Sequence, residues 1–431
     1  MVAVVPEGEE IAAVTVREFD GDRDGAAVER LESACEVGPS GGKMCLFTDL
    51  LGDPLCRVRH SPAYLMLVRS SAIAVVSLLF TNPIVAEAAG AGIVGVVRGC
   101  VKTVSCGQGQ GQGPNNLMFA KVGYLLGLRV SPAHRRRGVA RRLVDRMEAW
   151  FRRAGAEYAY VATDAGNEPS VGLFTARCGY AKFRAPSLLV HPVFRHDLSP
   201  PSSSLSRRRK AQVVEISPRE AEMLYRARFA GVEFFPSDID AVLSNPLSLG
   251  TFLAIPAAGK ASTSPEWRGI EAFLASPPAS WAVASVWNSS DAFRLEVRGA
   301  PRLWRAAASA TRAADAAAPW LRIPSVPNLF APFGVHLLYG LGGGDGPDTP
   351  AMARALCRHA HDMARRAGAR VVAAEVAAGD PVRAGVPHWP RLGAEDLWCI
   401  KRLAEGYGDG ALGDWTKAPP GASIFVDPRE F

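Results

Sequence analysis

With 431 residues, of which 48% are hydrophobic and 21% charged, the chain is long and apolar enough to build the cores of two globular domains. Its net charge is +7, but its basic residues are not interleaved with aromatic ones and no recognition-helix pattern is present, which argues against direct nucleic-acid binding. The eight cysteines form no Cys-x-x-Cys pair. This spacing favours free thiols over a disulfide framework or a zinc ribbon, and we expect no metal.

The first ten residues contain no basic segment, so no secretory signal is predicted. The most apolar stretch, residues 72–80, is much shorter than the roughly 20 residues of a membrane span, and we expect a strand extension or hairpin there. No membrane association is therefore predicted. Up to residue 120 the patterns predict, in order, a strand over 14–19, a helix over 24–35, a helical piece over 47–51, strands over 63–68 and 93–104, and a flexible loop over 105–116.

The most informative segment is a strand, a basic loop and a helix in succession. The strand-like run Gly123–Val130 leads into the loop Arg135-Arg-Arg-Gly-Val-Ala140, and an amphipathic helix follows and ends at Gly155. A buried strand is predicted next, over residues 157–163. Free backbone N–H groups and the positive end of the helix dipole meet at such a loop, and its glycine lets the backbone approach a ligand closely. The segment predicts a pyrophosphate site.

The pattern Arg135-x-x-Gly138-x-Ala140 resembles the acyl-CoA loop of the GCN5-related N-acetyltransferases, usually Arg/Gln-x-x-Gly-x-Gly/Ala. The resemblance implies an α/β fold of the α+β sandwich type with a central sheet, and acetyl-CoA as co-substrate. The strand before the loop should diverge from the strand at 157–163, so that the pantetheine arm can pair with its backbone.

A second stretch, residues 167–180, resembles the other motif of this family, with Asn167 as a helix N-cap. It departs from the family pattern in two ways. The spacing to Gly179 is one residue longer than usual, and the usual tyrosine is absent. Its place is taken by Phe174 when counted from Asn167 and by Thr175 when counted back from Gly179.

The resemblance assigns a set of cofactor-binding residues. These are Leu128, Arg129, Val130, Arg135, Arg136, Arg137, Gly138, Val139, Ala140, Arg141 and Asn167. The strand backbone would hold pantetheine and provide an oxyanion donor, while the loop amides and arginines would hold the diphosphate.

The acid–base residues are harder to assign. A lysine amine, with a pKa of about 10.4, must lose a proton before it can attack. Family enzymes often carry a carboxylate on the strand before the loop, but Gly123–Val130 has none. The predicted catalytic residues are Tyr160, Glu157, Asn167 and Cys178, with Asp164 and Glu168 as further candidates for the base. The alternative to a catalytic role is a packing role for the tyrosine, and exposure to solvent at the surface for the carboxylates.

The second half of the chain repeats features of the first. Arg152-Arg-Ala-Gly-Ala156 recurs as Arg365-Arg-Ala-Gly-Ala369, and the apolar positions of the preceding helix recur with it. At the same offset the loop becomes Asp348-x-x-Ala351-x-Ala353, where an acidic residue would repel a phosphate. We therefore expect two tandem acetyltransferase-like domains, of which the C-terminal copy is degenerate and structural. Chance similarity of two Arg/Ala-rich helices is the alternative.

These patterns divide the chain into an acetyl-CoA-binding domain over residues 1–195, a Ser/Pro/Arg-rich linker over 196–211 and a degenerate domain over 212–431. The linker contains the basic cluster Arg207-Arg-Arg-Lys210. Such a cluster is compatible with nuclear import, and equally with an ordinary solvated linker.

Longer strings are similar to the plant HOOKLESS-type probable N-acetyltransferases. Among them are Leu46-Phe-Thr-Asp-Leu-Leu-Gly-Asp-Pro54, Glu233-Phe-Phe-Pro236 and the final stretch, residues 414–431. That resemblance implies residence in the nucleus, a role in seedling growth and in auxin and ethylene responses, and acetylation of proteins, with histones or a transcription regulator as candidate acceptors. The other interpretation is a non-catalytic regulator that uses the same fold to bind acyl-CoA or a partner protein, because the motif tyrosine and the strand carboxylate are absent.

Overall fold

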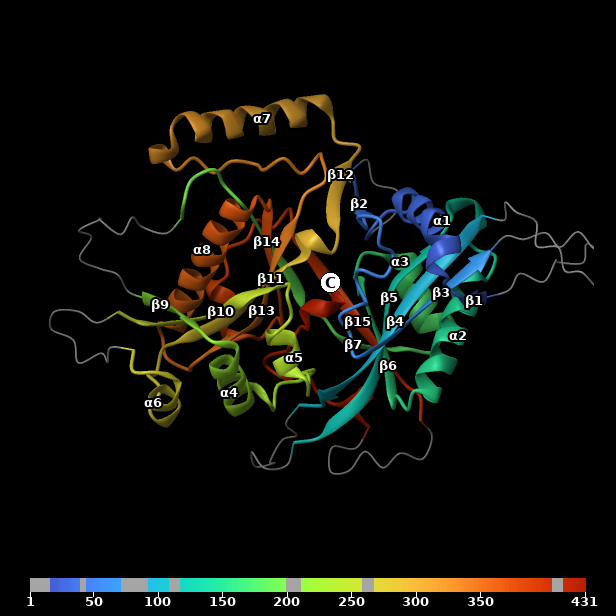
Figure 1. Cartoon of the computed structure of the whole chain (residues 1–431), viewed down its shortest axis with the longest axis horizontal. Coiled ribbons are helices and arrows are strands. Elements are labelled where there is room, and N and C mark those ends of the chain that lie inside the picture. The colour runs from blue at the N-terminus through green and yellow to red at the C-terminus, as the bar shows by residue number, and fades with distance from the viewer. Residues whose placement is uncertain are drawn as a thin grey trace, which may run out of the picture.

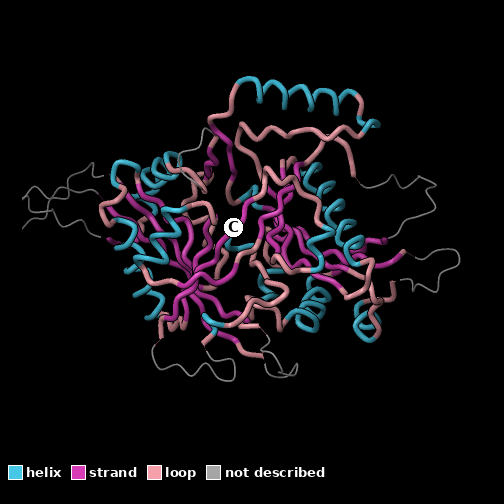
Figure 2. Tube along the Cα trace, turned by 180° about the vertical axis from the view of Figure 1, so that it is seen from behind, coloured by secondary structure: helices cyan, strands magenta, loops and turns pink. Residues whose placement is uncertain are grey.

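The computed structural model describes residues 16–38, 44–70, 92–107, 117–198, 211–257, 267–404 and 414–431. The expected hairpin at 72–80, most of the loop at 105–116 and most of the linker at 196–211 lie outside these residues. The described strands form one sheet of 13 strands and a separate two-stranded sheet. Figures 1 and 2 show the strands of both halves of the chain meeting in the middle of the molecule, with most helices to either side.

The first half contains an antiparallel run of strands that ends in a parallel pair. The neighbours are β1, β3, β4 and β5, and β5 then runs parallel to β6. Its elements are β1 (Val16–Glu18), α1 (Gly21–Ala34), β2 (Cys45–Asp49), β3 (Ala63–Ser70), β4 (Ile93–Ser105), β5 (Phe119–Val130), α2 (Val139–Arg153), β6 (Tyr158–Asp164), α3 (Glu168–Gly172), β7 (Ala181–Arg184) and β8 (Ser187–Pro192). The apolar stripe of α2 packs on one face of this sheet, and α1 packs on the other.

The second half has a matching order of neighbouring strands in the sheet. Its neighbours are β9, β10, β11 and β13, and β13 runs parallel to β14. Its elements are β9 (Ala211–Ile216), α4 (Pro218–Phe229), α5 (Ile239–Leu243), β10 (Ser248–Pro256), α6 (Ile270–Ala275), β11 (Ala282–Asn288), β12 (Arg294–Arg298), α7 (Arg302–Ala317), β13 (Val335–Gly343), α8 (Thr349–Ala367), β14 (Val371–Val376) and β15 (Ala394–Arg402). Helix α8 takes the place that α2 has in the first half.

The register of the two parallel pairs shows the repeat residue by residue. Val122 on β5 is opposite Tyr158, and Val335 on β13 is opposite Val371, so both partners lie 213 positions further along (335 from 122 and 371 from 158). The same offset joins Gly127 (φ 59°) to Gly340 (φ 58°). This is the offset of the Arg-Arg-Ala-Gly-Ala repeat, so one folding unit is present twice, as the predicted tandem arrangement requires.

Each half gives one strand to the other. β15, from near the end of the chain, pairs with β6 over Tyr158–Asp164, and β8 pairs with β14 over Val371–Val376. The large sheet therefore runs without a break from one half into the other. Strand pairing crosses the predicted boundaries at 195 and 212 in both directions. The division of the chain into domains at these positions stays a prediction.

One expected element has a different structure. Residues 47–51 were predicted to be helical, but Cys45–Asp49 form β2, which pairs antiparallel with Arg294–Arg298 of β12. The prediction was wrong because the partner strand lies about 250 residues away in the sequence and leaves no local signal.

The final stretch of the chain lies between the two halves, where Figure 1 marks the C-terminus. Phe425 belongs to the core of the second half and Val426 to that of the first. Asp427 is fully buried and accepts hydrogen bonds from Lys102 and Arg429, and Arg429 also pairs with Asp238. This segment, residues 424–431, joins the two halves through both apolar contacts and ion pairs.

Candidate functional site

The described residues enclose a cavity of about 1370 Å³ that reaches from the basic loop to the second half of the chain. The first half supplies the end of β5, the end of β6, the loop before α2 and the start of α3. The second half supplies side chains from β14, β15 and the final segment, including Glu375, Asp396, Trp398 and Glu430. The cavity thus lies where the two halves meet.

The basic loop has the geometry of an anion-binding helix start. Two residues have left-handed backbone, Arg136 (φ 61°) and Gly138 (φ 73°), and Gly138 is the N-cap of α2. No side chain caps the helix, so its first N–H groups stay open to a ligand. A Cβ built on Gly138 meets no protein atom within 4 Å, because it points into the open space in front of the helix. The residues present therefore fit a diphosphate.

Strands β5 and β6 diverge beside this loop. They pair from Val122 to Leu125, and beyond Leu125 the register ends, although both strands continue. The cavity is lined there by Leu128, Arg129 and Val130 on one side and by residues 161–164 on the other. The predicted divergence is thus present, and β5 offers backbone groups that β6 does not use.

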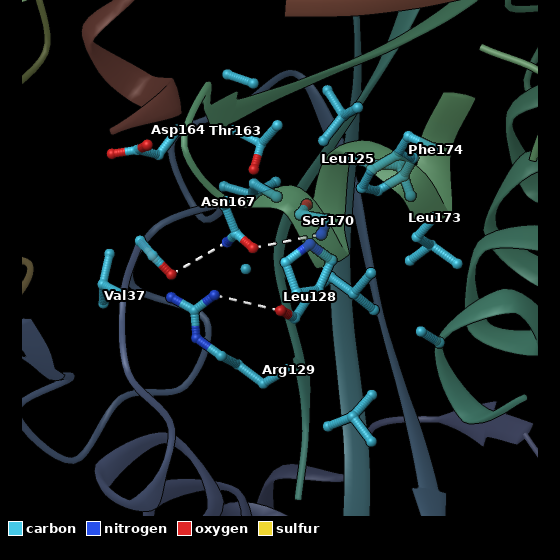
Figure 3. Close-up of a pocket in the computed structure, with 18 of the residues that line it drawn as sticks. Val37, Leu125, Leu128, Arg129, Thr163, Asp164, Asn167, Ser170, Leu173 and Phe174 are labelled. Atoms are coloured by element: carbon cyan, nitrogen blue, oxygen red, sulfur yellow. Dashed lines mark hydrogen bonds between the residues drawn. The ribbon is translucent and has the colours of Figure 1, made fainter. Parts of the chain in front are cut away.

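A glycine bulge and a buried ion pair support this end of β5. The pairing of β4 with β5 shifts register opposite Gly127, and a Cβ there would lie 2.7 Å from Nη1 of Arg98. Arg98 is fully buried and donates to Glu32 at 2.6 Å, and Arg129 lies 3.4 Å from the same carboxylate. Burial would raise the pKa of Glu32, but the two arginines outweigh burial and lower it. Figure 3 shows Arg129 at the cavity, donating to the Leu128 carbonyl.

Asn167 lies at the cavity wall, where it orders the turn into α3. Its side chain accepts from the Ser170 amide at 3.3 Å and donates to the Gly38 carbonyl at 3.0 Å (Figure 3). The segment Leu173–Arg177 that follows is a π-helical turn. A π turn holds one more residue than an α turn, which explains the longer spacing to Gly179.

Of the four predicted catalytic residues, the structure brings only Asn167 to the cavity. Tyr160 is fully buried in an aromatic cluster and donates to Glu430. Glu157 lies at the opposite end of β6, where it accepts from the Lys121 amide. Cys178 is buried, and burial is the main reason that its pKa rises to about 11, which keeps it a thiol. The motif position Phe174 is also buried.

Most of the predicted cofactor-binding residues line the cavity. These are Leu128, Arg129, Val130, Arg135, Arg136, Gly138, Val139, Ala140, Arg141 and Asn167. Arg137 is exposed beside the loop but does not line the cavity. Arg135 donates to the Val130 carbonyl at 3.3 Å, which ties the loop to the end of β5.

Four acidic residues of the cavity were not predicted from the sequence: Glu36, Glu375, Asp396 and Glu430. The last three lie more than 200 residues from the loop in the sequence. Asp396 does occur in the string Asp396-Leu-Trp-Cys-Ile-Lys-Arg402, which resembles the HOOKLESS-type proteins. That string, and the final stretch that contains Glu430, were the available signals.

The corresponding loop of the second half is filled by its own residues. A Cβ on Gly344 would lie 2.4 Å from the Ala279 carbonyl, and one on Gly346 would lie 2.2 Å from the Ser280 hydroxyl. The Asp348 amide donates to Ser280, and Thr349 donates to the Gly344 carbonyl. The amides of Gly344, Gly346, Asp348 and Thr349 are thus bonded within the protein, which accords with the structural role expected for the degenerate copy.

In the parts of the chain that the structure describes, no group of three or more His, Cys, Asp or Glu side chains could hold a metal ion. None of the helices there is both long and apolar enough to span a membrane.

Comparison with known proteins decides the family. Residues 77–180 match the model of the Acetyltransferase (GNAT) family. The chain is 52% identical, over 97% of its length and 99% of the relative's, to the probable N-acetyltransferase HLS1-like of Arabidopsis thaliana. It is 53% identical to the probable N-acetyltransferase HLS1 of the same plant, over 96% and 99% of the two chains. The chain belongs to the HLS1 family of probable N-acetyltransferases.

A third relative is the acetyl transferase GW6a of Oryza sativa subsp. japonica, which is 41% identical over 97% of both chains. Membership of the HLS1 family implies that the protein binds an acyl-CoA. The protein is thus a transferase of the acetyltransferase type.

Proposed function

We propose that the protein transfers the acetyl group of acetyl-CoA to an amine, in particular to a lysine side chain of a protein. The observation that carries the proposal is the single cavity that joins the open N–H groups at Gly138, the free edge of β5 and a group of carboxylates. The first feature suits the diphosphate, the second the pantetheine arm, and the third a cationic amine.

The two ends of the cavity carry opposite charges. Arg135, Arg136 and Arg141 lie at the loop, and Asp396 and Glu375 lie at the other end. An anionic acyl donor and a cationic acceptor would therefore be held at separate ends. A lysine-rich protein segment fits the acidic end, and histone tails and basic segments of transcription regulators are of this kind.

We further propose that this chemistry takes place in the nucleus, in the regulation of growth and of auxin and ethylene responses. The proposal is supported by the basic cluster at 207–210 and by the similarity to HLS1 over nearly the whole chain. Fractionation of plant cells that express the tagged protein tests it, and a loss of nuclear signal in a variant with Arg207–Lys210 replaced by alanines is expected.

Gly138→Trp is expected to weaken acetyl-CoA binding at least tenfold, because the indole would occupy the space in front of α2 where the diphosphate fits. Isothermal titration calorimetry with acetyl-CoA measures the effect. Gly155→Trp is the matched control. Gly155 is a left-handed glycine (φ 77°) at the other end of the same helix, so the strain is similar and the loop is intact. Equal loss of binding in both variants would contradict the assignment.

Gly127→Ala and Gly340→Ala are a second matched pair, at equivalent left-handed positions of the two halves. Each is expected to destabilise the protein by about 1–3 kcal/mol, since an added Cβ is strained and collides with Arg98 or Tyr225. Only Gly127→Ala should also weaken acetyl-CoA binding, because it alone disturbs the strand at the cavity. Urea unfolding and calorimetry give the two readouts, and weaker binding in Gly340→Ala would count against the proposed strand.

The competing function is a regulator that binds acyl-CoA without turnover. The observation that favours it is the absence of the motif tyrosine, whose place is taken by the buried Phe174 or by Thr175, which donates to the Val171 carbonyl. Incubation with radiolabelled acetyl-CoA and libraries of histones and lysine peptides separates the two functions. Transfer of label supports the enzyme, and tight binding with no transfer to any acceptor supports the regulator.

A further inference from the structure

The acidic end of the cavity contains carboxylates from both halves of the chain. Asp164 ends β6 in the first half, while Glu375 on β14, Asp396 on β15 and Glu430 in the final segment come from the second. Asp164 and Asp396 face each other as partners in the β6–β15 register. The cavity connects all four to the end of β5, where the acyl group of the donor is expected.

Two of the four carboxylates, Glu430 and Asp164, already have a role in the fold. Glu430 is bound by Lys102 and by the Tyr160 hydroxyl. Asp164 accepts from the Gly166 amide at 2.7 Å, which forms the turn after β6. Asp396 lies beside Asp164, at the outer end of β15.

Glu375 differs from these residues. Its Oε1 accepts from the indole N–H of Trp398 at 2.9 Å, while among the described residues its Oε2 has no hydrogen-bond partner and no cation pairs with it. The half-buried side chain is thus fixed by one oxygen and has the other available to the cavity. A base that must accept a proton from a bound amine needs this combination of a fixed position and a free oxygen.

The exchange of strands explains how Glu375 reaches the cavity. β8 pairs with β14 at Leu188–Glu375, and the same Leu188 pairs with Ala394 of β15. The end of β14 is therefore held next to the start of β15, which in turn lies beside β6. At the repeat offset of 213, Glu375 corresponds to Ala162 of β6. The degenerate half thus has a carboxylate at a position where the acyl-CoA-binding half has a methyl group.

We propose that Glu375 is the general base of the transfer, so that the second half of the chain supplies a catalytic group to the acyl-CoA-binding half. The inference rests on the proposed acetyl transfer to an amine. The acceptor arrives as an ammonium ion and gives one proton to Oε2 of Glu375. Its nitrogen then forms a bond to the thioester carbon as the carbon–sulfur bond breaks. The nitrogen loses a second proton, the departing thiolate gains one, and Glu375 returns its proton to solvent.

The charges around Glu375 support this role. The ionisable groups that face it are Asp396 on β15, Glu430 in the final segment and Tyr124 on β5. Burial is the main cause that raises the pKa of Glu375 well above its usual range, and Asp396 raises it further. Burial, with Asp164 next, raises the pKa of Asp396 to about 6. A carboxylate with a raised pKa is a stronger base than an ordinary one, and the acidic surroundings attract the ammonium group.

The test is Glu375→Gln in the full-length protein, assayed with acetyl-CoA and pooled lysine peptides. The amide keeps the shape and can still accept from Trp398, so the fold should persist. We expect kcat to fall by about 10²–10⁴-fold, while the calorimetric Kd for acetyl-CoA stays within about twofold. Glu395→Gln is the control, since Glu395 is an exposed neighbour on β15 that does not line the cavity, and it should keep wild-type kcat.

Asp396→Asn gives a second readout that does not depend on the folding of the first variant. The base works only when deprotonated, so kcat falls as the pH drops through the pKa of Glu375. Loss of the Asp396 charge lowers that pKa, and the acidic limb of the pH profile should move to lower pH.

The outcomes separate this inference from the proposed function. A Glu375→Gln variant with wild-type kcat and an unchanged pH profile would overturn the inference alone. Wild-type protein that binds acetyl-CoA but acetylates no peptide would overturn the proposed transfer and the inference together. An acidic limb that stays in place in Asp396→Asn would also count against Glu375.

Discussion

Asp427→Ala is expected to lower the free energy of unfolding by about 3–5 kcal/mol, the usual cost of removing one partner from a buried ion pair. Asp427 has no exposed surface, and it accepts from Nε and Nη2 of Arg429 and, at 3.3 Å, from Lys102. Its loss leaves two buried cations with fewer partners. Since the final segment connects both cores, the two halves should lose stability together.

Urea unfolding measures this loss, and Asp240→Ala is the control. Asp240 forms an exposed ion pair with Arg226 at 3.3 Å, and its removal should cost no more than about 1 kcal/mol. A loss below about 1 kcal/mol in Asp427→Ala would show that the buried pairs are not needed for stability.

Asp427 should also make the stability of the protein depend on pH. Burial would raise the pKa of Asp427, but Arg429 and Lys102 outweigh burial and lower it. A carboxyl whose folded pKa lies below its unfolded value of about 3.9 stabilises the protein above that pH, and this contribution is lost as the pH falls further. The wild type should therefore lose stability below about pH 4 more steeply than Asp427→Ala does.

Phe151→Ala is also expected to lower the free energy of unfolding by about 3–5 kcal/mol, because it removes the ring that fills the space between α2 and the sheet. Phe151 is fully buried. Its ring lies so close to β4 and β5 that a Cβ on Gly99 would be 3.0 Å away and one on Gly123 only 2.4 Å away. These two glycines therefore make room for the ring.

Thermal and urea unfolding check the effect, with Trp150→Ala as the control. Trp150 is the preceding residue of α2 but is only half-buried, so its loss should be smaller. Comparable losses of unfolding free energy in the two variants would mean that the space above Gly99 and Gly123 is not specifically filled by the Phe151 ring.

The nucleotide end of the site could be predicted from sequence because its determinants are local. The loop residues Arg135–Ala140, the periodic apolar face of α2 and the helix end at Gly155 lie within about 20 consecutive residues. Glycine in the left-handed region and the 3.6-residue period do not depend on distant parts of the chain. The repeat of these features at 365–369 also predicted the second domain.

The acid–base end could not be predicted in this way. Tyr160 and Cys178 were chosen for their nearness to the loop in sequence, but both are buried away from the cavity. The carboxylates at the cavity, Glu375 and Asp396, are placed there by pairings between strands that are hundreds of residues apart. The order in which strands pair is a property of the whole chain, and no window of sequence contains it.

The crossing of β8 and β15 between the halves also constrains biosynthesis. β6, the last strand of the acyl-CoA-binding half in the sheet order, stays an open edge until residues 394–402 have left the ribosome and paired with it. The acyl-CoA-binding half therefore cannot complete its fold as an early cotranslational unit, and it exposes this unpaired strand edge while the rest of the chain is made. A transcript truncated before residue 394 should yield an aggregation-prone product in place of a smaller working enzyme.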